Sequence, residues 1–96
     1  MHAVTRSYSG QGASESFDRL VELKDEVEDL LRGVQGFVSY TVFRTGEGWV
    51  TVTVCQDKAG TDESVRAARD FMAAKASDTG VGAPTVNEGP VAIHLS

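Results

Sequence analysis

The stretch FVSYTVFRTGEGWVTVTVC, residues 37–55, predicts a β-hairpin at the centre of the chain. Phe37 to Thr45 and Trp49 to Gln56 are rich in valine, threonine and aromatic residues, as strands are, and Gly46-Glu47-Gly48 between them suits a tight turn. If Arg44 pairs with Trp49, the two faces divide as Ser39, Thr41, Phe43, Val50, Val52 and Val54 on one side, and Val38, Tyr40, Val42, Thr51, Thr53 and Cys55 on the other. Neither face is polar enough to remain in water, so we expect both to be covered.

Apolar residues recur at helical spacing on both sides of this hairpin. The stripe before it predicts one helix, from an N-cap at Ser14 to the glycines Gly33 and Gly36. The stripe after it predicts a second helix, which follows a loop over residues 57–60, begins with an N-cap at Thr61 and ends before Gly80. The members of the two stripes are Phe17, Leu20, Val21, Val27, Leu30, Leu31 and Val34, then Val65, Ala68, Met72 and Ala76.

The two ends of the chain supply the remaining strands. His2 to Tyr8 reads as the first strand, and the alternation of Val91, Ile93 and Leu95 reads as the last. The resulting order is strand, helix, strand, strand, helix, strand within one domain, residues 1–96, which is the order of a ferredoxin-like α+β sandwich. In that fold two helices cover one face of a four-stranded antiparallel sheet of order 4-1-3-2. The second apolar face therefore predicts a homodimer formed through the sheet.

Composition excludes several classes of function. The net charge of −5 argues against a nucleic-acid partner, because phosphates favour a basic surface. Cys55 is the only cysteine, so neither an internal disulfide nor a thiolate-rich metal site is expected. No apolar run approaches the ~18 residues of a membrane span, and the N-terminus lacks the apolar centre of a signal peptide. We therefore expect a cytoplasmic protein with no membrane partner.

The two histidines are candidates for a functional pair. In the expected sheet the first and last strands are antiparallel neighbours, so His2 and His94 would approach each other. Two imidazoles on adjacent strands can share protons near neutral pH. A catalytic metal needs a third protein ligand, and no acidic residue stands near either histidine in the sequence, so no metal site is predicted.

Polar-tipped residues on the strands are the candidates for ligand binding. Tyr8, Tyr40, Arg44 and Trp49, together with Arg6, are groups that an anionic or aromatic ligand would use in an apolar pocket. The alternative is that the aromatics are core or dimer-contact residues and that the arginines pair with helix carboxylates. No phosphate loop, Ser-His-Asp set or pair of carboxylates is recognisable, so the catalytic residues stay unknown.

The chain resembles a known group of proteins. The approach to the second strand, Val34-Gln35-Gly36-Phe37-Val38-Ser39-Tyr40, and the Val-Thr-Val-Thr-Val run at residues 50–54 are similar to those of the dimeric α/β-barrel superfamily. That superfamily contains the antibiotic-biosynthesis-type monooxygenases, and this chain looks like a member of it. The resemblance implies that two sheets pack face to face as a barrel with the helices outside, and that a ligand cavity lies between sheet and helices.

The resemblance leaves the activity open. Some relatives oxidise polyketide-like aromatics without a cofactor, whereas others bind haem. The Asn-Trp-Tyr group of the quinone-forming enzymes has no clear match, since Asn87 is the only asparagine, and neither histidine falls on a helix as a haem ligand would. One hypothesis is a monooxygenase-like enzyme that needs no cofactor and acts on a small aromatic or polyketide-like molecule. The other is a non-catalytic dimeric module that binds a small ligand or a protein partner.

Overall fold

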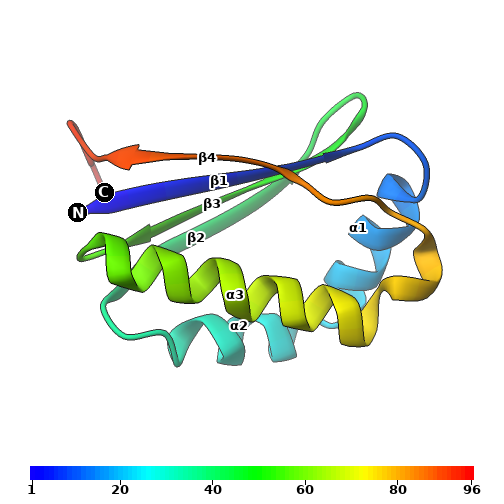
Figure 1. The fold of residues 1–96 in the computed structure, drawn as a ribbon, viewed down its shortest axis with the longest axis horizontal. Coiled ribbons are helices and arrows are strands. Elements are labelled where there is room, and N and C mark those ends of the chain that lie inside the picture. Colours follow the sequence, from blue (N-terminus) through cyan, green and yellow to red (C-terminus); the bar gives the residue numbers. More distant parts are fainter.

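The computed structural model describes all 96 residues as one four-stranded antiparallel sheet with helices on a single face (Figure 1). The sheet order is β2-β3-β1-β4, which is the 4-1-3-2 order of the predicted ferredoxin-like α+β fold. The elements in chain order are β1 (His2–Ser9), α1 (Ala13–Glu22), α2 (Lys24–Arg32), β2 (Phe37–Arg44), β3 (Gly48–Cys55), α3 (Lys58–Lys75), the short 3₁₀ helix η1 (Ser77–Thr79) and β4 (Thr85–Pro90).

The central hairpin has the predicted register over most of its length. Arg44 pairs with Trp49, so Tyr40 and Val42 face the helices together with the side chains opposite them on β3. A β-bulge between Phe37 and Ser39 breaks the alternation and places Phe37 opposite Cys55. The predicted place of Val38 beside Cys55 is therefore wrong, because one extra residue at the start of β2 shifts the pairing.

The predicted first helix is two helices. The chain leaves helical geometry at Leu23, where φ is −101° and ψ is 25°. The backbone hydrogen bonds from Leu23 to Arg19 and from Val27 to Leu23 persist, so the apolar spacing continues through the break and gives no sign of it. The N-cap of α1 is Gly12 and not the predicted Ser14, because Gly12 has a φ of 81°, which turns the chain out of β1.

The second predicted helix begins earlier than its sequence suggests. Asp57, not Thr61, is the N-cap of α3, and its side chain accepts a hydrogen bond from the Gly60 backbone N–H at 3.1 Å. Gly60, which suggested a loop, lies instead in the first turn of α3. A Cβ at this position would be 2.8 Å from Cys55 Cβ, so the close packing of α3 on β3 requires a glycine here. Cys55 is buried as a small hydrophobe, and this burial raises the pKa of its thiol.

The last strand lies before the predicted one. β4 pairs with β1 from Ser7↔Thr85 to His2↔Pro90, and the Val91 N–H bonds to the Met1 carbonyl at 2.9 Å. After this bond the chain pairs with no strand. Ile93 and Leu95 are 88% and 94% exposed, so their apolar alternation does not mark a strand in the single chain.

The core fills the layer between the sheet and the helices. Tyr8 of β1 and Trp49 of β3 form its sheet side, and Ala13, Leu20, Val27 and Leu31 of the first two helices pack on them. Burial of these apolar side chains is the main contribution to the stability of a chain of this size. None of the helices is long and apolar enough to cross a membrane.

Candidate functional site

Arg6 is the most unusual residue of the core. Its position between Val4 and Tyr8 on β1 turns its side chain toward the helices, and it is only 5% exposed. Its Nη1 donates a hydrogen bond to the Tyr8 hydroxyl at 2.9 Å, but Arg6 belongs to none of the ion pairs of the structure. A buried charge without a counter-charge is costly, by several kcal/mol as an order of magnitude. The fold therefore holds a cation that lacks an anionic partner.

A cavity of about 490 Å³ opens onto this guanidinium, between α3, β1 and the segment from η1 to β4. We call it the Arg6 cavity. Two arginines, Arg6 and Arg69, line it, and no carboxylate or histidine does. The rest of its wall consists of Tyr8, Val65, Met72, Ala73, Ala76, Ser77, Val81, Gly82, Ala83, Pro84 and Val86. A pocket of this size with apolar walls and a few cationic groups suits an aromatic anion.

The inner wall of the Arg6 cavity is held rigidly. The Tyr8 ring stacks on the Trp49 ring with centroids 4.1 Å apart, and the Trp49 indole N–H donates to the Ser16 hydroxyl at 3.0 Å. Phe17 meets the same indole edge-on at 6.2 Å. Trp49 thus lies behind Tyr8 and supports it, while Tyr8 itself lines the cavity. The structure brings these two predicted ligand residues together in different roles.

Thr51 lies directly opposite Arg6 in the pairing of β1 with β3. Its hydroxyl is fully buried and has no hydrogen-bond partner. Leaving such a group unpaired costs about 1–3 kcal/mol. Two adjacent strands therefore place an unpaired hydroxyl beside an uncompensated cation at the centre of the sheet.

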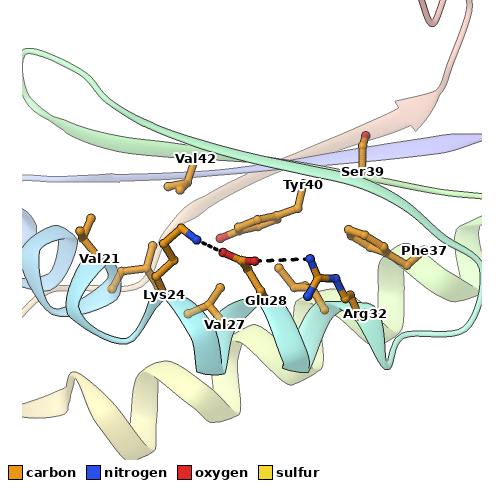
Figure 2. A pocket seen from close by; sticks show the side chains of 11 residues that line it. Val21, Lys24, Val27, Glu28, Arg32, Phe37, Ser39, Tyr40 and Val42 are labelled. Atoms are coloured by element: carbon orange, nitrogen blue, oxygen red, sulfur yellow. Dashed lines mark hydrogen bonds and ion pairs between the residues drawn. The ribbon is translucent and has the colours of Figure 1, made fainter. Parts of the chain in front are cut away.

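Tyr40 lines a second cavity, of about 500 Å³, between β2 and the helices α1 and α2. Figure 2 shows the Tyr40 ring projecting toward α2, where Glu28 lies between Lys24 and Arg32. We call this the Glu28 cavity. Burial raises the pKa of the Tyr40 hydroxyl, and the positive charge of Arg6 opposes that rise. The Lys24 ammonium holds the pKa of the Glu28 carboxyl below its ordinary value, so Glu28 is ionised.

A small internal cavity of about 20 Å³ lies between the two larger ones. It shares Arg6 and Met72 with the Arg6 cavity, and it shares Tyr40 and Leu31 with the Glu28 cavity. This volume suffices for about one water molecule. The three cavities thus lie in the layer between the sheet and the helices. Arg6 lines both the Arg6 cavity and the small cavity, and Tyr40 lines both the small cavity and the Glu28 cavity.

Arg44, the predicted ligand-binding arginine, lies outside these three cavities. Its Nη2 donates to Asp18 at 2.9 Å, its Nη1 donates to the Ser14 hydroxyl at 3.2 Å, and the guanidinium lies 4.4 Å from the centre of the Phe17 ring. This exposed ion pair with a helix carboxylate is the structural alternative that the sequence left open for the arginines.

His2 and His94 lie at the two ends of the chain, which Figure 1 draws side by side. His2 pairs with Pro90, and His94 lies in the exposed segment four residues farther along the chain. The Thr61 hydroxyl donates to the Lys58 carbonyl, so it accepts a hydrogen bond from His2 Nδ1 at 2.9 Å. The other ring nitrogen lies 3.7 Å from Glu88. No group of three or more His, Cys, Asp or Glu side chains is arranged to hold a metal ion.

Sequence reasoning named Arg6 as a candidate ligand residue but missed two other parts of this site. Arg6 and Tyr8 are two residues apart on one strand, and this spacing places both side chains on the same face. The cavity-facing stripe of α3 at Val65, Arg69, Met72 and Ala76 also has the spacing of one helix face. The segment from Val81 to Pro84, by contrast, carries no signal that it closes a cavity.

Comparison with known proteins rests on structure alone. No protein-family model matches the chain, and no curated protein sequence matches it. A protein of unknown function from Nitrosomonas europaea, NE2512, superposes with a TM-score of 0.70 at 13% identity, over 99% of this chain and 91% of that one. An ethyl tert-butyl ether degradation (EthD) family protein from Bacillus halodurans superposes with a TM-score of 0.61 at 15% identity, over 95% and 98% of the two chains.

A monooxygenase from the gene ActVA-Orf6 of Streptomyces coelicolor, solved in complex with nanaomycin D, superposes with a TM-score of 0.60. Its identity is 18%, over 99% of this chain and 90% of that one. Similarity at this level of identity establishes the fold and not the reaction. The chain shares with these solved structures the ferredoxin-like α+β fold that its sequence predicted.

Proposed function

We propose that this protein binds an acidic aromatic molecule, a phenol or enol, as its anion in the Arg6 cavity and oxidises it with molecular oxygen without a cofactor. The observation that carries the proposal is the buried Arg6 guanidinium, which has no carboxylate partner and lines a cavity of about 490 Å³. An anionic ligand would supply the missing counter-charge. The chain as a whole carries a net charge of −5, so this cationic cavity is a local exception.

The cavity favours the ionised form of the ligand. No histidine or carboxylate lines it, so no general base is available next to a bound ligand. A guanidinium in an apolar site stabilises a neighbouring anion and thereby lowers the pKa of a bound phenol or enol. Binding would therefore generate the electron-rich anion directly, with the Tyr8 ring as one wall of the site.

Such an anion can react with oxygen without further help from a metal or flavin. For a phenol-type ring, the overall change is ArH(OH) plus O₂ to the quinone plus water. One oxygen atom enters the ring as the new carbonyl, the other leaves as water, and the ring supplies the four electrons. The protein contributes anion binding and orientation in a cavity with mostly apolar walls. The fold supports the proposal, because one structural neighbour, the protein of the gene ActVA-Orf6, is described as a monooxygenase.

The experiment is an oxygen-uptake assay with dihydroxyanthrone, whose oxidation to dihydroxyanthraquinone changes its absorbance. The protein is first titrated with the compound under nitrogen to measure binding, and oxygen is then admitted. We expect binding of the anion and uptake of one O₂ per quinone formed. Arg6→Gln should weaken binding by about thirtyfold or more, because it removes a buried charge pair. Arg44→Gln, outside the cavities, should match the wild type.

The same assay separates the enzyme from its alternative. A non-catalytic binding module is favoured by the absence of a base from the cavity wall. Binding that depends on Arg6, with oxygen uptake no faster than in buffer, would support the module. If the anion does not bind, or binds equally to the Arg6→Gln variant, both forms of the proposal are wrong.

We also propose that two copies associate through the sheet face opposite the helices. Val52, Phe43 and Val50 project from this face, and Phe43 is 47% exposed. In Figure 1 no helix covers that side of the sheet. Burying an apolar face of this kind is favourable at about 25 cal/mol per Å². Native mass spectrometry should show a dimer for the wild type and a monomer for Val52→Glu, whereas Arg66→Glu on the surface of α3 should stay dimeric. A monomeric wild type would contradict this part.

A further inference from the structure

We propose that the ligand of the Arg6 cavity carries two acidic groups, and that Arg69 is the residue that selects for the second one. This inference rests on the proposed function and narrows its substrate class to aromatic molecules with an acidic group at each end. Arg69 belongs to α3, lines the same cavity as Arg6, and is exposed to solvent. The buried arginine would hold the inner group and the exposed arginine the outer one.

The position of Arg69 on its helix supports this role. The residues of α3 that line the cavity are Val65, Arg69, Met72 and Ala76, together with Ala73. Four of these five are apolar, as expected for the face of a helix that covers a cavity. Arg69 lies on that face one turn from Val65 and one turn from Ala73. An arginine in the middle of an otherwise apolar lining stripe is placed to contact whatever occupies the cavity.

Arg69 is also free of intramolecular partners. It takes part in none of the ion pairs and none of the side-chain hydrogen bonds, whereas Arg19, Arg32 and Arg44 each pair with a carboxylate. The two guanidinium groups give the cavity two positive charges with no acidic residue in its wall. A ligand with one acidic group would neutralise only half of this charge.

The experiment compares two probes on three proteins. The probes are a naphthalenedicarboxylate with its acids at opposite ends of the rings and the corresponding monoamide, which differ by one charge and hardly in shape. The proteins are the wild type, Arg69→Gln and Arg66→Gln. Arg66 is a matched control, because it is an exposed arginine of the same helix that does not line the cavity. Dissociation constants are measured by isothermal titration calorimetry at low salt.

We expect the wild type and Arg66→Gln to prefer the diacid by roughly three- to tenfold, as for a partly exposed guanidinium–carboxylate pair. Arg69→Gln should bind both probes alike, with the affinity that the wild type shows for the monoamide. Added salt should reduce the preference in the wild type, because the outer pair is screened. Equal affinities of the wild type for both probes would overturn the role of Arg69 and leave the proposed function standing. Failure of the wild type to bind either probe would overturn both.

Discussion

Replacing Arg6 by methionine should stabilise the protein while it removes ligand binding. Exchanging buried charges for apolar side chains of similar size is often neutral or stabilising, by about 1–4 kcal/mol. The hydrogen bond from Arg6 Nη1 to the Tyr8 hydroxyl, 2.9 Å long, is lost, at a cost of about 1 kcal/mol. We expect the free energy of unfolding to rise by about 1–2 kcal/mol, and the melting temperature by roughly 5–10 °C for a domain of this size.

Urea denaturation followed by tryptophan fluorescence measures this change, because Trp49 lies in the core behind Tyr8. Arg44→Met is the control, since its exposed ion pair should contribute less than about 1 kcal/mol. Dihydroxyanthrone under nitrogen should stabilise the wild type and leave Arg6→Met unchanged. A loss of about 2 kcal/mol or more in Arg6→Met would refute the reasoning, because it would show that Arg6 is held by favourable contacts within the protein and needs no ligand as a counter-charge.

Three further substitutions test other parts of the structure. Gly12→Ala should lower the free energy of unfolding by about 1–3 kcal/mol in urea denaturation. Gly12 has a φ of 81°, and a Cβ there would be 2.4 Å from the Thr79 carbonyl oxygen, so an unchanged stability would contradict this packing. Tyr40→Phe should lower the free energy of unfolding by less than about 1 kcal/mol, because the buried Tyr40 hydroxyl lies near Arg6, whose Nη1 already donates to the Tyr8 hydroxyl; a larger loss in urea denaturation would show that Tyr40 also holds Arg6 by a structural hydrogen bond. The pKa of Glu28 is lowered by Lys24, so its contribution to stability is present above the ordinary pKa of 4.5 and is lost as the pH falls through the lower folded value. Glu28→Gln should lack that acid-side loss when unfolding is compared at neutral pH and below 4.5, and an identical pH profile would argue against the pairing.

The parts of the site that depend on local pattern could be predicted from the sequence. Tyr8 and Tyr40 were predicted as ligand residues from their place on strands, and both line cavities. Arg44 also lies on a strand and was predicted as a ligand residue, but it lies outside the cavities because it pairs with Asp18 on α1. The packing of α1 against the end of β2 decides whether a strand residue lines a cavity or pairs with a helix carboxylate. The spacing of residues within β2 cannot predict this packing.

The fold errors have a common physical cause. Val91, Ile93 and Leu95 alternate as a strand does, but β4 pairs with β1 through Thr85–Pro90, and the chain after Val91 pairs with no strand. Thr61 is a suitable N-cap residue, but Asp57 lies four residues earlier and its side chain accepts the hydrogen bond from the Gly60 backbone N–H. Gly60 lies inside the helix, where Cys55 packs against it. In both cases the local preference is correct, but contacts with another element decide the outcome, namely the pairing of β4 with β1 and the packing of Gly60 against Cys55.

Periodicity and turn chemistry, which are local, predicted the central hairpin, the two helical regions and the first strand, and they place Arg6 and Tyr8 on one face of that strand. The tertiary structure decided which of these side chains share a cavity, which arginine finds a carboxylate, and that Arg6 finds none. Burial and pairing of charge depend on contacts between distant segments, such as α3 and the residues after η1 that close over Arg6. Those contacts exist only after the chain has folded, and so the most informative charge of this protein is an ordinary arginine in its sequence.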